Sequence, residues 1–288
     1  MKLLAPPPPA ELPAEALLAR LRCRRAALAH DPAVDPADLR TWLLPRLDRR
    51  LRRALTPYLE VVAMRTLVVA LRHRLAGLSP PAALLHQSWL AAGLAPLVET
   101  PGEAGRVVAR VEQALAPDYP FARGVAKAFH DQGPGAVETR LTTGMLGQAL
   151  ASAREPAVLL TVRFLIDLRN LLSVLRHWRW QLRQPPQLLP GGEVAVPQLA
   201  RIWAGGDRNA FGRLAARLGT NGPLDPEPRA AEHQLLAGLE LKLRRAGRDP
   251  LGIGVVLDTL WRCEVEARDH ALHSAVGITG DWLSEAWP

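Results

Sequence analysis

Arginines at a repeated spacing are the residues of this sequence with the clearest chemical potential. Arg65 and Arg72 lie seven residues apart in one leucine-rich stretch, and Arg169 and Arg176 lie seven apart in another. Residues seven apart share one face of a helix, so each pair would form a basic face. A guanidinium pairs with a carboxylate through two hydrogen bonds, so these faces could hold acidic groups of a partner. The alternative is ion pairing inside the chain, for which candidate carboxylates are Asp167, Glu264 and Glu266.

These arginines belong to an internal repeat. Residues 63–85, AMRTLVVALRHRLAGLSPPAALL, align with residues 167–189, DLRNLLSVLRHWRWQLRQPPQLL, at a constant offset of 104, and nine of the 23 positions are identical. Each copy predicts a helix, a proline stop and an apolar pair. Chance similarity between two Leu/Arg-rich helices is the alternative, but the shared Arg-His pair and proline argue against it.

A third, weaker copy lies about 99 residues further on, where Arg268 stands opposite Arg169 and Asp269 stands opposite Asn170. Three helical repeats would then divide the chain into residues 1–102, 103–205 and 206–288.

The composition favours an all-α fold. Leu, Ala and Arg dominate, alternating strand patterns are scarce, and the 26 prolines stand mostly between apolar-periodic stretches. Those residues form helices readily, and the prolines stop them. We expect helices near 14–29, 37–55, 58–77, 82–92, 103–115, 121–130, 135–153, 157–183, 198–204, 207–218, 229–246 and 251–277, after an extended leader at Pro6–Pro9.

Catalytic motifs are missing. None of the three lysines precedes Ser or Thr, so a P-loop is excluded, and neither G-x-S-x-G nor H-E-x-x-H occurs. His270 and His273 share a helical face with Glu266 and could hold a metal, but two ordinary surface histidines are the preferred interpretation. We therefore expect a non-catalytic chain without a cofactor.

The net charge of +8 suggests an anionic partner, although 33 of the 36 basic residues are arginine, which a GC-rich genome alone would explain. Trp178 and Trp180 alternate with arginines, as in a nucleic-acid contact strip. Packing of these rings against a neighbouring helix is the preferred interpretation, so no nucleic acid is expected, and a basic nucleic-acid-binding repeat protein is kept as the alternative.

Two widely separated cysteines, Cys23 and Cys263, suggest a reducing cytoplasmic environment, and no signal peptide is evident. The longest charge-free run, residues 75–98, contains Gly77, Pro80 and Pro81 and is too broken to span a bilayer as one helix. Membrane association would therefore require a protein partner or a surface patch.

The closing stretch, RDPLGIGVVLDTLWRCEVEARDHALHSAVGITGDWL at residues 248–283, resembles the C-terminal signature of the C subunit of V/A-type ATPases, the counterpart of the d subunit of the eukaryotic vacuolar enzyme. Residues 164–176, FLIDLRNLLSVLR, resemble the family's middle repeat through Asp167, Asn170, Leu171 and Arg176. The segment 191–202 resembles its Gly-Gly loop. The matching residues of the closing stretch are Asp249, Pro250, Leu251, Gly252, Gly254, Val256, Leu257, Glu264, Glu266 and Arg268.

This resemblance implies a funnel of three similar helical domains that sits on the cytoplasmic end of a proteolipid rotor ring and receives the central stalk. It implies a peripheral location on the membrane, ion transport without catalysis, and a partner interface on the repeated faces. The residues expected at that interface are Arg65, Arg72, Arg169, Asn170, Arg176 and Arg268. Asp269-His270-Ala271 and the proline-rich N-terminal part depart from the family pattern.

Overall fold

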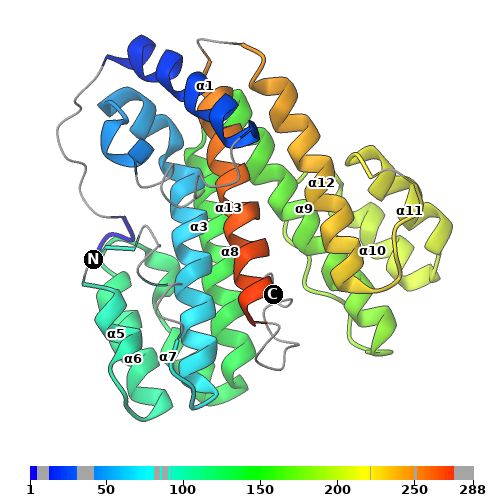
Figure 1. Cartoon of the computed structure of the whole chain (residues 1–288). Coiled ribbons are helices and arrows are strands. Elements are labelled where there is room, and N and C mark those ends of the chain that lie inside the picture. The colour runs from blue at the N-terminus through cyan, green and yellow to red at the C-terminus, as the bar shows by residue number, and fades with distance from the viewer. Residues whose placement is uncertain are drawn as a thin grey trace. The chain divides into compact units, whose positions relative to one another are not determined.

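The computed structural model describes residues 1–4, 13–30, 42–80, 85, 90–91, 93–220, 222–249 and 252–275, with the backbone alone for 14, 25–30, 44 and 266–275. The described residues are all-α, as the composition predicts (Figure 1). Their extended pairing is limited to an isolated antiparallel bridge between Leu4 and Leu90. The expected leader at Pro6–Pro9 and most of the expected helix at 82–92 lie outside these residues.

Most helices follow the predicted order, with short 3₁₀ turns η1 and η2 between them, but the short helix α5 was not predicted. Their bounds are α1 Ala14–His30, η1 Leu44–Arg46, α3 Arg49–Leu75, α5 Ala95–Glu99, α6 Ala104–Leu115, η2 Pro120–Ala122, α7 Val125–Gln132, α8 Pro134–Ser152, α9 Pro156–Arg179, α10 Val196–Gly205, α11 Arg208–Arg217, α12 Pro228–Ala246 and α13 Ile253–Ala275.

The break expected between residues 55 and 58 is wrong, because α3 continues through Pro57. A proline inside a helix removes one backbone hydrogen bond. Here Leu55, Tyr58 and Leu59 beside it are all buried, and that apolar burial offsets the lost bond. By length and composition α3 could also cross a bilayer, but 61% of its apolar window is buried in the protein, as in the core helix of a soluble domain.

The chain divides into two compact units. The first comprises Met1–Pro8, Leu55–Ser152 and Ala286–Pro288, and the second comprises Pro9–Ala54 and Ala153–Glu285. The division into three repeats stays a prediction, since this grouping of the chain neither supports nor tests it.

In the first unit, α5, α6, α7 and α8 pack in succession. Val107, Val108, Val111 and Leu115 of α6 are buried at the three- and four-residue spacing of one helical face. Gly144 of α8 faces Phe121 of η2 so closely that a Cβ atom there would lie 2.3 Å from Phe121 Cγ. This glycine therefore sets how near η2 approaches α8.

In the second unit, α9, α12 and α13 pack against one another, α1 packs on α13, and α10 packs on α11 (Figure 1). α9 is the central helix of this unit, and most of its length from Val158 to Leu175 is buried. Glycines allow the closest approaches. A Cβ on Gly238 of α12 would lie 2.8 Å from the carbonyl oxygen of Leu218, and one on Gly254 of α13 would lie 2.3 Å from that of Ala246.

We predict that Gly144→Ala destabilises the protein by about 1–3 kcal/mol, because the added methyl group overlaps the Phe121 ring. Gly147→Ala on the same helix is the matched control. Nothing lies within 4 Å of its Cβ position, so the higher helix propensity of alanine should stabilise by about 0.5–1 kcal/mol. Urea unfolding followed by circular dichroism measures both. Equal effects of the two substitutions would contradict the close packing at Gly144.

Candidate functional site

The two repeat copies end in the same turn. In α3, the N–H of Ala76 donates to the carbonyl of Arg72 at 3.0 Å, and that of Leu78 donates to His73 at 2.9 Å. In α9, the backbone N–H of Trp180 donates to the carbonyl of Arg176, and the N–H of Leu182 donates to the carbonyl of His177, both at 2.9 Å. Each bond is displaced by the same 104 residues as the sequence repeat. The prediction that these segments form equivalent helix-turn units is thus confirmed through Leu78 and Leu182. Residues 81–84 lie outside the described part of the chain.

This turn requires a residue in the left-handed backbone conformation, with positive φ, directly after the helix. Gly77 fills that place in the first copy with φ +79°, and Gln181 fills it in the second with φ +51°. Gln181 is the non-glycine residue with positive φ among the described residues. The second copy therefore keeps the turn with a residue that enters this region less readily than glycine.

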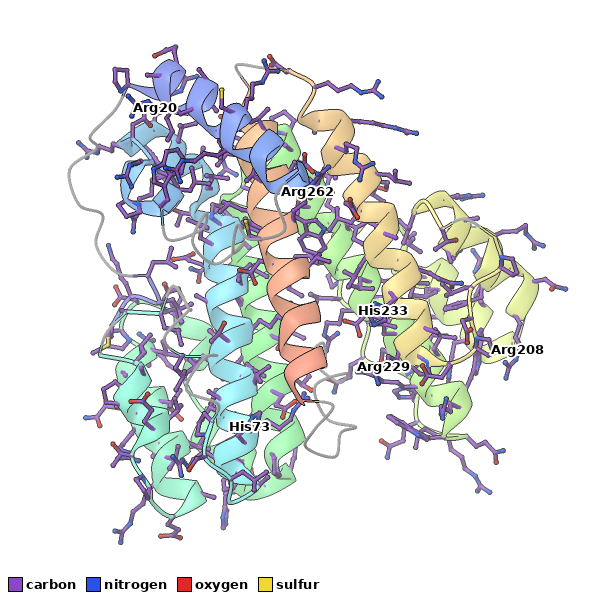
Figure 2. The ribbon with its side chains drawn as sticks, viewed as in Figure 1. Arg20, His73, Arg208, Arg229, His233 and Arg262 are labelled. Carbon is purple, nitrogen blue, oxygen red and sulfur yellow. The ribbon has the colours of Figure 1, made fainter. Side chains whose placement is uncertain are left out.

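The histidines at matching positions of the two copies each bond to the backbone in the last turn of their own helix. The Nδ1 atom of His73 (Figure 2) lies 2.8 Å from the carbonyl oxygen of Val69. The Nδ1 atom of His177 lies 2.8 Å from the carbonyl oxygen of Ser173. A carbonyl accepts, so Nδ1 carries the proton in both rings. Burial lowers the pKa of His73, and the bond to Val69 partly opposes this shift. Packing or capping is the role expected for both residues.

The tip of each turn presents an exposed leucine. Leu78 is 49% exposed and Leu182 is 45% exposed, at equivalent positions of the two copies. Among the described residues, exposed large apolar side chains are few, the others being Met1, Trp180 and Leu241. The repeat therefore places one apolar contact point in each compact unit.

The side chain of Arg72 forms an ion pair with Glu138 inside the first unit. Its Nε donates to Oε1 of Glu138 at 2.9 Å and its NH2 donates to Oε2 at 2.6 Å. The side chains are 21% and 11% exposed. Of the two interpretations left open for Arg72, a partner contact and an ion pair inside the chain, this geometry matches the ion pair inside the chain. Glu138 was not predicted, although it stands in the apolar stripe of the helix expected at 135–153, where a carboxylate signals a buried cation.

Asn170 and Arg169 are buried in the second unit and hold the chain that follows the turn. The Asn170 side chain donates to the carbonyl of Leu189 and accepts from the N–H of the same residue, both at 2.8 Å. Arg169 donates to the carbonyl of Gln187 at 3.1 Å. Burial lowers the pKa of Arg169 to about 10, and Arg176 adds to this shift. Both residues therefore support the following loop from inside the second unit, and their place at a partner interface stays a prediction.

Asp167 completes this support. Its Oδ2 accepts from the N–H of Glu193 at 2.7 Å and its Oδ1 accepts from Val194 at 3.1 Å. A Cβ atom on Gly192 would lie 2.0 Å from Oδ1, so only glycine fits there. Burial raises the pKa of Asp167 to about 6, despite the two backbone donors. The Gly-Gly segment and the middle-repeat segment, both singled out in the sequence, therefore pack directly against each other.

The remaining expected interface residues are Arg65, Arg176 and Arg268. Arg65 and Arg176 are half-buried on α3 and α9, and Arg268 lies on α13 where only the backbone is described. The side chains of Glu266, His270 and His273 fall in the same part of α13. Elsewhere in the described residues no cluster of three His, Cys, Asp or Glu side chains could hold a metal.

A scan against models of protein families finds no match to this chain, and a search of curated proteins finds none either. The resemblance to the V/A-type ATPase family is therefore an expectation that rests on the residues quoted above.

We predict that Arg72→Ala lowers the free energy of unfolding by about 1–3 kcal/mol, since it leaves Glu138 buried without its cation. Removing both partners should cost less than the sum of the single losses. Arg106→Ala is the control, because its pair with Glu103 is exposed, at 84% and 75%, and should contribute less than about 1 kcal/mol. If the losses from the Arg72 and Glu138 single variants simply add up in the double variant, the two side chains do not interact, which would contradict the ion pair.

Asp167 predicts a pH dependence of stability. Its folded pKa of about 6 exceeds its ordinary 3.8, so the native state binds more protons between these values, and stability falls as pH rises through them. Asp167→Asn removes this titration and also places an amide NH2 against a backbone N–H. The stability advantage of the wild type should thus shrink by about 1–2 kcal/mol from pH 4 to pH 6.5 and then stay level. A pH-independent difference in urea unfolding would contradict the raised pKa.

Proposed function

We propose that this chain is a non-catalytic coupling component of a V/A-type rotary ATPase, which connects the membrane proteolipid ring to the central stalk during ion transport. The sequence resemblance at residues 248–283, 164–176 and 191–202 suggests this role. The protein would lie peripherally on the cytoplasmic face of the membrane and would be held there by the ring.

The repeated helix end carries the proposal. Leu78 and Leu182 are exposed at the same position of two equivalent turns, one in each compact unit. A ring of identical subunits offers identical binding sites, so a partner with repeated contact points suits it. An apolar tip on a hydrogen-bonded turn can be desolvated with little loss of conformational entropy.

The support inside each copy fits the same role. Arg72 bonds to Glu138 near the end of α3, and Asp167 in the middle of α9 holds the loop at Glu193 and Val194, both through largely buried polar contacts. A part that transmits torque must keep its contact points rigid, and buried, hydrogen-bonded polar groups favour one arrangement. These residues support the interface without touching the partner.

Sedimentation with membranes tests the proposal. The purified chain should pellet with vesicles that contain the proteolipid ring and stay in the supernatant with vesicles of lipid alone. Leu78→Asp combined with Leu182→Asp should weaken ring binding about tenfold or more, since charged groups would be buried at the contacts. Leu241→Asp is the matched control, because Leu241 is 39% exposed outside the repeat. Equal pelleting without the ring, or an unaffected double variant that keeps its helicity, would overturn the role.

One observation favours the alternative of a nucleic-acid-binding protein. Trp180 is 55% exposed, and Arg179 and Arg183 near it are exposed as well. An exposed ring between cations can stack on a base. Binding of single-stranded RNA that weakens steeply with salt, and that Trp180→Ala abolishes, would support this alternative over the rotor role.

A further inference from the structure

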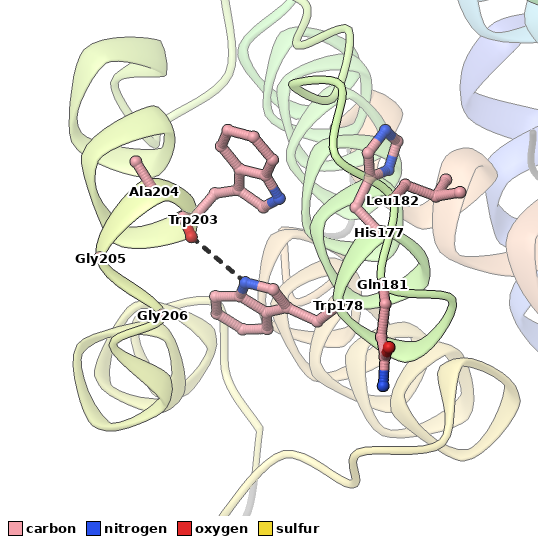
Figure 3. A pocket seen from close by; sticks show the side chains of 8 residues that line it. All are labelled: His177, Trp178, Gln181, Leu182, Trp203, Ala204, Gly205 and Gly206. Carbon is pink, nitrogen blue, oxygen red and sulfur yellow. Dashed lines mark hydrogen bonds between the residues drawn. The ribbon is translucent and has the colours of Figure 1, made fainter.

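A shallow groove of about 560 Å³ lies in the second unit where the end of α9 meets the end of α10 (Figure 3). Its walls come from two short segments, each at the end of a helix. The walls include His177, Trp178 and Leu182 from α9 and its turn, and Trp203 and Gly205 from α10.

The aromatic walls are fixed in place. The Trp178 indole N–H donates to the carbonyl oxygen of Trp203 at 3.3 Å, and its ring meets Phe211 edge-on at 5.0 Å between centroids. Trp203 meets His177 edge-on at 6.5 Å. Figure 3 shows both indoles at the wall and the hydrogen bond from the Trp178 indole to the Trp203 carbonyl oxygen. The groove is therefore preformed, so an apolar group can enter without a cost for ordering the rings.

The ends of the two helices make the interior unsuitable for an anion. Carbonyl groups at a helix C-terminus carry a partial negative charge, and α9 and α10 both end here. Neutral apolar groups fit the aromatic walls better than a phosphate or carboxylate does. A cation would suit these walls, but Arg208 already lies over the Trp178 ring, at 5.6 Å from its centroid.

The rim of the groove is basic. Arg179 directly follows the wall residue Trp178 in the chain, Arg183 directly follows Leu182, and both are exposed, as is Arg208 (Figure 2). The NH1 atom of Arg179 lies 3.3 Å from Oε1 of Glu227, but both side chains stay about half exposed, at 51% and 46%. Asp207 is engaged as the N-cap of α11, where it accepts from the N–H of Ala210. The rim thus favours carboxylates just outside a groove that favours apolar groups inside.

We propose that this groove binds an acidic amphipathic segment of a partner protein, with a large apolar side chain between Trp178 and Trp203 and carboxylates paired with the rim arginines. The exposed Trp180 and Leu182 extend the apolar contact beside the groove. Planar guanidinium groups pair with carboxylates through two hydrogen bonds, so Arg183 and Arg208 suit this contact. The site does not require the rotor role, because any partner with such a segment fits it.

Two model peptides test the proposal on the full-length protein. The first is an amphipathic helix of about 15 residues, roughly four turns, with Leu and Trp on one face and Glu on the other. The second carries Lys in place of every Glu. Fluorescence anisotropy should show saturable binding of the Glu peptide with a Kd in the micromolar range, and binding of the Lys peptide weaker by about tenfold or more.

Two matched pairs of variants locate the site. Gly205→Leu fills the groove, and Gly147→Leu is its control, since both glycines are exposed and have nothing within 4 Å of the Cβ position. Arg183→Glu reverses the rim charge, and Arg163→Glu reverses an exposed charge on α9 about 20 Å along the helix from the groove. The groove and rim variants should each weaken the Glu peptide about tenfold, while both controls leave it unchanged.

Three outcomes would overturn the proposal. The first is equal or tighter binding of the Lys peptide, which would indicate a site for cations. The second is Glu-peptide binding that the controls weaken as much as Gly205→Leu and Arg183→Glu do. The third is no binding of the Glu peptide together with salt-dependent binding of single-stranded RNA, which would assign the basic rim to nucleic acid.

Discussion

The second unit depends on a short polar sequence placed inside an otherwise apolar helix. Asp167, Arg169 and Asn170 of α9 are buried, and each bonds to the backbone between Gln187 and Val194. This loop is rich in proline and glycine and has no regular secondary structure, so these bonds satisfy backbone groups that no helix or strand pairs. The central helix thus both fills the core and sets the path of the chain that leads into α10.

The sequence predicted the helices and the repeat well, because both depend on local patterns. Apolar periodicity and proline stops are readable in one dimension, and the bonds at Ala76 and Trp180 confirm the constant offset. The break at Pro57 was mispredicted because local propensity favours a stop there, while burial of Tyr58 and Leu59 favours continuation. Tertiary packing decided between these effects, and a single sequence does not reveal it.

The candidate site was harder to predict for a related reason. The spacing of Arg72, Arg169 and Arg176 shows which helix face they share but not what lies opposite that face. Glu138 stands 66 residues from Arg72, and Gln187 stands 18 from Arg169. Only folding shows that such residues meet, so these internal contacts of Arg72 and Arg169 could not be read from the sequence. The groove between Trp178 and Trp203 was missed for the same reason, since it forms from two segments that have no pattern in common.

The two turns at Gly77 and Gln181 show that one backbone shape can be formed by two different sequences. More than half of the aligned positions between the copies now differ, including the residue in the left-handed conformation. The backbone hydrogen bonds are nevertheless the same, and so is the exposed leucine beyond them. Two different sequences therefore form the same surface shape. The internal support differs between the copies: it is a carboxylate on α8 in the first and the following loop in the second.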